Sequence, residues 1–336
     1  MRPSHLTARW LVVTTTVLAA GLAVSIAAAA LIGPVHVSLA RVFAPGGTAT
    51  PDGVILLRTR LPRVFLAVIV GGSLSVAGTA LQAALQNPLA CPHLLGVSGG
   101  AAVAGALALI AGVDPVSPMA PLAAFAGALG TIALVAGVAR AGGRTSPHAI
   151  LLVGVVCNAL AAAAIMLVNA IASYRQAQGV LFWIMGALST QSWTLVGLAG
   201  AYALAGLAWL VRHGRDLNLL AAGDEGAQQL GVEVERVRRI VFVAASLLVG
   251  AAVSVSGMIS FVGLVTPHLL RLVLGPDQRL LLPASFLGGA ILLVWADTLA
   301  RTALGPVELP VGVVTALLGG PFFLVLLRRS LVRSRV

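Results

Sequence analysis

Residues 96–100, Gly-Val-Ser-Gly-Gly, match the G-x-S-x-G pattern of serine nucleophiles. A serine needs a general base within hydrogen-bond reach, so His148 or His268 would have to face Ser98. Chance matches are expected in a chain this rich in glycine, alanine and serine. A serine protease of the intramembrane type is therefore kept only as an alternative.

Other catalytic constellations are missing from the sequence. Its 21 basic residues are all arginines, and without lysine it cannot contain the phosphate-binding G-x-x-x-x-G-K-[ST] loop. It has no H-E-x-x-H motif, its six histidines are scattered, and Cys91 and Cys157 lie far apart in or beside apolar segments. We therefore expect no enzymatic activity, no metal site and no cofactor bound by this chain.

Asp297 is the one acidic residue that lies well inside an apolar segment. Ionisable residues within a membrane are costly and are usually functional, so a proton-coupled secondary transporter is a second alternative. Arg301 follows four residues later, on the same face of a helix, and is the natural partner of Asp297. This spacing favours a local ion pair over a proton relay.

The elements that carry these residues are apolar. Of the residues, 59% are hydrophobic and only 9% are charged, which is too few polar groups to cover a water-soluble domain. A helix of about 20 apolar residues crosses a bilayer. We place ten such segments at about 10–33, 64–85, 95–113, 117–139, 149–171, 192–211, 240–257, 259–274, 280–303 and 309–331. The sequence thus predicts an all-α polytopic membrane protein with a single transmembrane domain over 1–336, and a partial or re-entrant helix at 179–188.

Arginine placement predicts the orientation. Ten spans put both termini on one side, and that side receives 15 of the 21 arginines. The other side receives Arg41, Arg58, Arg60, Arg63, Arg175 and Arg301. Because basic residues concentrate in cytoplasmic loops, both termini are expected in the cytoplasm. Basic residues are not clustered with aromatic ones on one face, so we expect no nucleic-acid partner.

One charged island, residues 223–239, falls in the longest cytoplasmic loop, at about 212–239. It holds four of the ten acidic residues and three arginines. Asp224 and Glu225 begin a short helix that Gly231 ends, with Ala227 and Leu230 on the side opposite the charges. A two-faced helix of this kind can dock into a groove on a partner protein. The alternative is a solvated helix that contacts nothing.

Seven blocks resemble the permeases of ABC importers for iron–siderophore complexes, haem and cobalamin. Within the island, EGAQQLG at 225–231 resembles the E-A-A-x-x-x-G signature of ABC importer permeases, with Gly226 in place of an alanine. The blocks are RLPR at 60–63, QNPLACPHLLGVSGGA at 86–101, FWIMGAL at 182–188, LNLLAAGDEGAQQLGV at 217–232, SGMISFVGLVTPHLLRL at 256–272, ADTLAR at 296–301 and ELPVGVVTALLGGPFF at 308–323. They run in order along nearly the whole chain, and they place 96–100 at the start of the third span.

The resemblance implies a homodimer in the cytoplasmic membrane of a bacterium or archaeon, with a translocation path on the two-fold axis. Two ATPase subunits, which would bind ATP and Mg²⁺, are expected on the cytoplasmic side, and a periplasmic or lipid-anchored substrate-binding protein outside. Residues 223–231 would then be the coupling helix, seated in a cleft of the ATPase.

The resemblance also implies roles for single residues. The family's outer docking arginines correspond to Arg60, Arg63 and Arg301, as exposed charges that pair with the binding protein. Interfacial anchoring is the alternative for Arg60 and Arg63. The cytoplasmic gate corresponds to Asn87 and Leu89, and through a weaker local match to Thr145 and Ser146. An iron–siderophore complex is the favoured substrate, ahead of cobalamin and haem.

Overall fold

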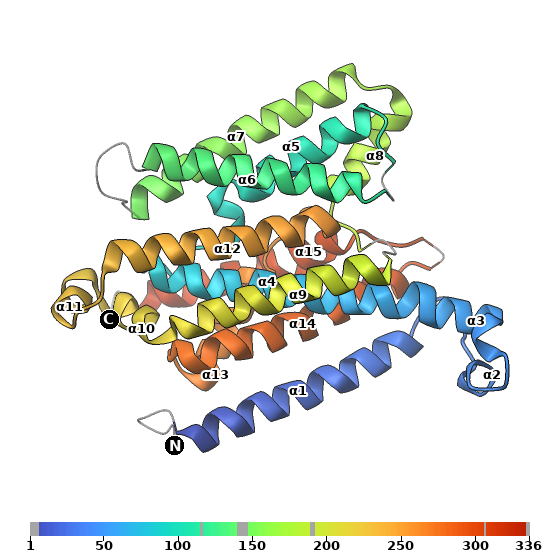
Figure 1. Ribbon diagram of the computed structural model, residues 1–336, viewed down its shortest axis with the longest axis horizontal. Coiled ribbons are helices and arrows are strands. Elements are labelled where there is room, and N and C mark those ends of the chain that lie inside the picture. The colour runs from blue at the N-terminus through green and yellow to red at the C-terminus, as the bar shows by residue number, and fades with distance from the viewer. Residues whose placement is uncertain (1–6, 115–116, 140–146, 189–191, 306, 334–336) are drawn as a thin grey trace.

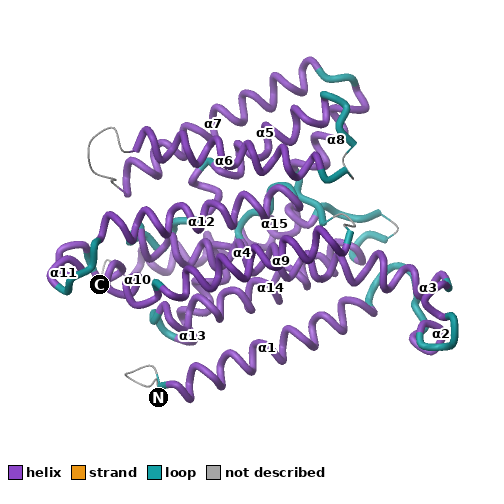
Figure 2. Tube along the Cα trace, in the orientation of Figure 1, coloured by secondary structure: helices purple, strands orange, loops and turns teal. Residues whose placement is uncertain are grey.

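The computed structural model describes residues 7–114, 117–139, 147–188, 192–305 and 307–333, in which the regular structure is helical (Figure 2). Each of the ten expected spans corresponds to an apolar helix. Among the described residues, seven helices are long and apolar enough to cross a membrane, and three shorter apolar helices lie at 97–110, 262–274 and 311–325. The prediction of an all-α polytopic protein is confirmed.

The helices form one bundle (Figure 1). In chain order they are α1 (Ala8–Leu31), α2 (Leu39–Val42), α3 (Pro51–Val54), α4 (Leu61–Ala84), α5 (Val97–Ile110), α6 (Met119–Ala139), α7 (Pro147–Ile171), α8 (Tyr174–Ile184), α9 (Trp193–Arg212), α10 (Gly214–Ala222), α11 (Asp224–Gln229), α12 (Val234–Ser256), α13 (Val262–Leu274), α14 (Gln278–Thr302) and α15 (Val311–Arg333). Short 3₁₀ turns, η1 (Gly47–Ala49) and η3 (Pro92–Leu95), and a π-helical segment, η2 (Ile55–Arg60), complete them.

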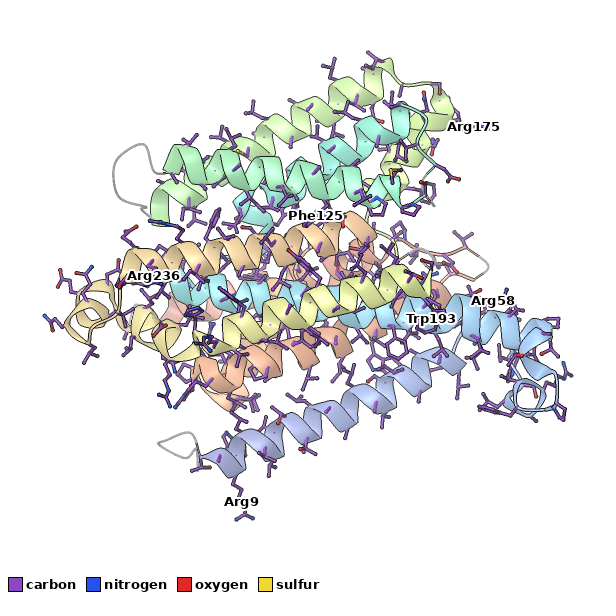
Figure 3. The ribbon with its side chains drawn as sticks, in the orientation of Figure 1. Arg9, Arg58, Phe125, Arg175, Trp193 and Arg236 are labelled. Carbon is purple, nitrogen blue, oxygen red and sulfur yellow. The ribbon has the colours of Figure 1, made fainter. Side chains whose placement is uncertain are left out.

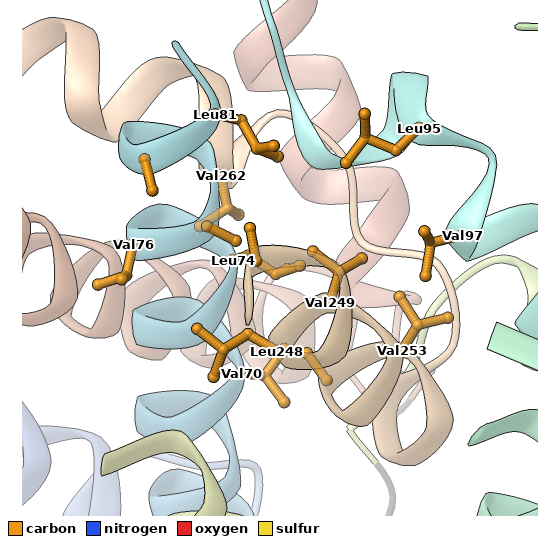
Figure 4. Packing of buried hydrophobic residues seen from close by; sticks show 14 of the residues in the cluster. Val70, Leu74, Val76, Leu81, Leu95, Val97, Leu248, Val249, Val253 and Val262 are labelled. Carbon is orange, nitrogen blue, oxygen red and sulfur yellow. The ribbon is translucent and has the colours of Figure 1, made fainter. Parts of the chain in front are cut away.

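Helix α4 is the centre of the bundle. It packs against α12, α13 and α14, while α1 lies along the outside (Figure 1). In the apolar stretch of the continuous helical segment 51–84, 89% of the residues are buried. In the corresponding stretch of α1, only 17% are buried. Valines and leucines of α4 interlock with those of α12 (Figure 4).

Glycine sets how closely α4 approaches its neighbours. A Cβ at Gly71 would overlap the backbone of Gly289 on α14, and one at Gly78 would overlap Gly263 on α13. Lipid supplies no hydrophobic force between helices, so close backbone contact through small residues is what holds them together. This explains why so apolar a core contains so much glycine.

Three boundaries differ from the sequence prediction. The second span begins earlier, because α3 and η2 lead into α4 without a break. The short helix expected at 179–188 is Tyr174–Ile184, since Ser173 caps it through a capping box with Gln176. Most of the loop expected at 212–239 is helical, as α10, α11 and the first turns of α12.

The two ends of the bundle carry different features. The start of α1 and the end of α15 lie at the same end as α10 and α11, while α2, α3 and α8 lie at the opposite end (Figure 1). Arg9 and Arg236 point outward at the first end, and Arg58 and Arg175 at the second (Figure 3). These four arginines thus lie at the ends that match the sides to which the sequence assigns them.

Candidate functional site

Helix α11 is the short helix that the charged island predicts. It starts after Gly223, runs from Asp224 to Gln229 and ends before Gly231, whose φ of 83° is in the left-handed region. The prediction that Ala227 and Leu230 lie on the same face of the helix is wrong. Ala227 is 1% exposed in the main core, whereas Leu230 is 69% exposed. The reason is that the helix lies against the bundle, so its outer surface combines Leu230 with the exposed Glu225.

Asp224 turns towards the bundle. Arg238 Nη2 donates to both of its carboxylate oxygens, at 2.7 and 2.8 Å, and Gln86 Nε2 donates to Oδ1 at 2.5 Å. The Arg238 side chain is only 2% exposed, and its Nε donates to Ala84 O at 3.2 Å. Asp224 therefore joins α11 to α12 and to the end of α4.

Sequence reasoning missed Gln86 and Arg238. A signal for Arg238 was present, because it shares the buried face of α12 with Val234, Val237 and Val241. An arginine on an apolar helical face needs a buried acceptor or anion. Glu235, three residues earlier on the same helix, lies 3.7 Å away, but the hydrogen-bonded partner, Asp224, lies on another helix and cannot be read from spacing.

A second polar contact holds α10. Asn218 donates to Asp277 Oδ1 at 2.9 Å and accepts from the Gln278 backbone N–H at 2.7 Å, which fixes α10 to the start of α14. Hydrogen bonds from the Arg279 side chain outweigh partial burial and, with Asn218, lower the pKa of Asp277 from 3.8 to about 2. Both α10 and α11 are thus attached to the bundle through carboxylates.

The segment expected to form the gate is a tight turn after α4. Asn87 Oδ1 accepts from the Leu89 backbone N–H at 2.9 Å, so the Asn87 side chain stabilises the turn. Leu89 is 42% exposed. The turn continues into η3, where Asn158 of α7 donates to His93 O at 2.7 Å. Thr145 and Ser146, the other expected gate residues, lie outside the described residues.

At the opposite end of the bundle, Asp297 has two arginine partners. Arg301 Nε donates to Oδ2 at 3.0 Å, which confirms the expected pair, and Arg63 Nε donates to Oδ1 at 3.0 Å. Arg63 Nη1 also donates to Glu308 at 2.7 Å. The start of α4 therefore meets the end of α14 and the segment just after it in one ion-pair cluster of Arg63, Asp297, Arg301 and Glu308.

Arg60 and Arg301 cap the end of α1. Arg60 Nη1 donates to Ala30 O at 3.1 Å and Leu31 O at 2.9 Å, and Nη2 donates to Val35 O. Arg301 donates to the carbonyls of Ala29 and Ile32, both at 3.2 Å. The last carbonyls of a helix have no partner within it, and positive charge is favoured there.

The expectation that Arg60, Arg63 and Arg301 present exposed charge is therefore wrong. Arg60 and Arg301 are 5% and 4% exposed, and the side chain of Arg63 is 13% exposed. Their guanidinium groups donate hydrogen bonds to carbonyls and carboxylates of the bundle. Arg58, five residues before Arg63 in the same continuous helix, is exposed instead (Figure 3). Docking through any of them remains a prediction.

Ser98 is 3% exposed in the first turn of α5, a poor position for a nucleophile. Within the described ranges, no cluster of three histidine, cysteine, aspartate or glutamate side chains could hold a metal ion. Cys91 and Cys157 are free thiols.

Known proteins resemble the chain along most of its length. The haemin transport system permease protein HmuU of Yersinia pestis is 40% identical over 291 residues, covering 84% of this chain and 86% of the relative. The cobalamin import system permease protein BtuC of Halobacterium salinarum is 44% identical, covering 84% and 75%. The Fe(3+) dicitrate transport system permease protein FecC of Escherichia coli is 36% identical, covering 86% and 87%.

A solved structure has the same fold. It is an inward-facing ABC transporter assigned to the metal-chelate type, with a TM-score of 0.83, 29% sequence identity, and coverage of 95% of this chain and 99% of that one. The sequence profile of the FecCD transport family matches residues 8–329. The helical bundle, the relatives and the profile agree, and the chain belongs to the FecCD transport family of ABC importer permeases.

Proposed function

We propose that this permease works as a homodimer, powered by two separate ATPase subunits and supplied by a substrate-binding protein. Family membership supports a role in import, and the structure of α11 supports this helix as the contact site for the ATPase. Helix α11 presents Glu225 and Leu230 outward while Ala227 and Asp224 attach it to the bundle. A short helix with an exposed face and a fixed base can receive force from a partner and pass it to the bundle as a rigid-body movement.

The end that carries α10 and α11 is proposed to face the cytoplasm. Arg9 and Arg236, which belong to the larger group of arginines in the sequence, point outward at this end, and the positive-inside rule favours the cytoplasm for that group. The binding protein would then dock at the opposite end, near α2, α3 and α8. The membrane would be the cytoplasmic membrane of a bacterium or archaeon.

The proposed substrate is a metal chelate, and an iron–siderophore complex in the first place. The relatives named above transport haemin, cobalamin and ferric dicitrate, which are all metal ions enclosed in an organic ligand. Selectivity would lie largely in the binding protein. ATP and Mg²⁺ would be bound by the ATPase subunits.

Reconstitution tests the proposal. The permease is placed in proteoliposomes with its ATPase and binding protein, and uptake of a ferric siderophore is measured, with cobalamin and haem as parallel substrates. We expect ATP-dependent uptake of one of these chelates, none without the ATPase, and no ATP turnover by the permease alone. An ATPase lacking its phosphate-binding lysine is the control.

Uptake that needs no ATP and stops with an uncoupler would contradict the proposal and favour a proton-coupled carrier. Asp297 weighs against that carrier, because two arginines already neutralise its carboxylate.

A further inference from the structure

Gln86 occupies a backbone position that favours glycine. It follows the end of α4 with a φ of 50°, in the left-handed region. The Gln86 N–H donates to Ala83 O at 3.2 Å and the Asn87 N–H to Gln82 O at 3.1 Å. These two bonds define a Schellman motif, in which glycine is preferred because a Cβ is unfavourable there. A glutamine in this place costs stability locally, so its side chain must have another use.

The side chain of Gln86 reaches the coupling helix. Its Nε2 donates to Asp224 Oδ1 at 2.5 Å, although the two residues are 138 positions apart in sequence. The same carboxylate accepts two hydrogen bonds from Arg238, whose Nε binds Ala84 O only two residues before Gln86. The start of α11, the first turns of α12 and the end of α4 therefore meet at one carboxylate.

The turn that follows Gln86 leads to α7. Asn87 closes the turn on Leu89, and η3 continues to the hydrogen bond between His93 O and Asn158. Gly154 of α7 lies so close to Leu94 that a Cβ would overlap its backbone. A displacement of the turn therefore has a direct mechanical route to α7.

We propose that Gln86 is a positioning residue for transport, which passes movement of α11 to the turn at 87–90 and on to α7. This inference rests on the proposed function, because it requires an ATPase that moves α11. Arg238 holds the Asp224 carboxylate in place, and the hydrogen bond from Gln86 couples the turn at 87–90 to any movement of that carboxylate. The hydrogen bond from the Gln86 side chain to Asp224 then explains why glutamine occupies a position that favours glycine.

Three variants of Gln86 test the proposal. Gln86→Gly and Gln86→Asn keep the left-handed turn, which both residues tolerate well, but remove the donor that reaches Asp224. Gln86→Lys keeps a long donor and the same backbone strain. The permease is reconstituted with its ATPase and binding protein, and thermal stability, ATPase association, ATP hydrolysis and substrate uptake are measured for each.

We expect the Gly variant to be as thermally stable as the wild type or more so, and to bind the ATPase normally. Its uptake per ATP hydrolysed should fall at least about tenfold, with a similar fall for Asn and near-normal uptake for Lys. A purely structural role predicts that uptake follows stability, which would make Gln86→Gly at least as active as the wild type. Uptake per ATP within about twofold of the wild type in the Gly variant would overturn the proposal.

Hydrogen exchange gives a readout that does not depend on transport. Addition of the ATPase with nucleotide should change exchange at 224–230 and at 87–91 in the wild type, but only at 224–230 in Gln86→Gly. Equal changes at 87–91 in both proteins would also overturn the proposal. If the wild type shows no response at 224–230 and no ATP-dependent uptake, the proposed function itself fails, which is a different result from an active Gly variant.

Discussion

Asp297 and Arg301 form an ion pair one helical turn apart on α14, with side chains that are 1% and 4% exposed. Arg63 approaches the other oxygen of the same carboxylate, with Nη2 at 2.9 Å from Oδ1. Since Arg301 also caps α1, this carboxylate offsets part of the positive charge at the junction of α1, α4 and α14. Removing it would leave two guanidinium groups without their buried partner.

Asp297→Asn should therefore lower stability by about 3–5 kcal/mol, the usual cost of breaking a buried ion pair. Thermal unfolding in detergent measures the loss, and any remaining uptake should still need ATP and ignore an uncoupler. Glu308→Gln is the matched control, because the Glu308 side chain is 48% exposed and its loss should cost about 1 kcal/mol or less. Normal stability with abolished uptake in Asp297→Asn would favour a proton carrier.

Substitution of the exposed Arg58 should affect docking of the binding protein without affecting folding, whereas substitution of the buried Arg60 should affect folding. Exposed charge speeds association, so Arg58→Glu should slow the on-rate at low salt and leave unfolding unchanged. Arg60→Glu should instead reduce the yield of folded protein, because two carbonyls at the end of α1 and that of Val35 lose their donor. Surface plasmon resonance at two salt concentrations measures the first effect, with Arg9→Glu at the opposite end as control. An unchanged on-rate in Arg58→Glu would remove this residue from the docking surface.

Charge reversal on the outer face of α11 should uncouple the permease without unfolding it. Glu225 is exposed in the first turn, where a carboxylate is favoured by the helix dipole by about 0.3–1 kcal/mol. Glu225→Lys should insert normally and keep its unfolding temperature, while ATPase association and uptake both fall. Normal association and uptake would mean that α11 is a linker in solvent.

Gly226→Ala should strengthen the same helix. A Cβ there meets no atom within 4 Å, and alanine is favoured over glycine in a helix by about 1 kcal/mol. Amide exchange at 224–230 should slow about fivefold, which corresponds to that free energy. Gly231→Val has equal space but a φ of 83°, so it should speed exchange instead. The same direction of change in both variants would contradict this account.

Acid should weaken the attachment of α10. The pKa of Asp277 is about 2 in the folded protein and 3.8 for a free side chain, so the unfolded state takes up the proton first as pH falls. The stability from Asp277 is complete above about pH 4 and is lost as pH falls towards 2. The wild-type unfolding temperature should therefore drop more steeply across this window than that of Asp277→Asn. Arg279→Gln, which removes the main donor, should flatten the curve in the same way, and parallel curves in all three proteins would contradict the prediction.

Composition and periodicity alone predicted the membrane class, the ten apolar helices and the existence of α11, because each depends on local hydrophobicity or on residues within one turn. The Asp297–Arg301 pair was predictable for the same reason, since its members are four residues apart. The motif blocks added the family, which the comparisons confirm.

Tertiary structure decided which charges are available to a partner. In the sequence Arg60 looks like a free outer arginine and Arg301 like a partner of Asp297 alone, but the end of α1 brings unpaired carbonyls to both. Asp224 looks like a surface residue of a charged loop, but the buried Arg238 turns it inward. Gln86 appears in the sequence only as the first residue of a family block, because its left-handed φ and its partner 138 residues away exist only once the helices pack. Hydrophobicity acts along one helix, whereas a polar side chain takes its role from whichever unpaired group the fold brings within hydrogen-bond distance.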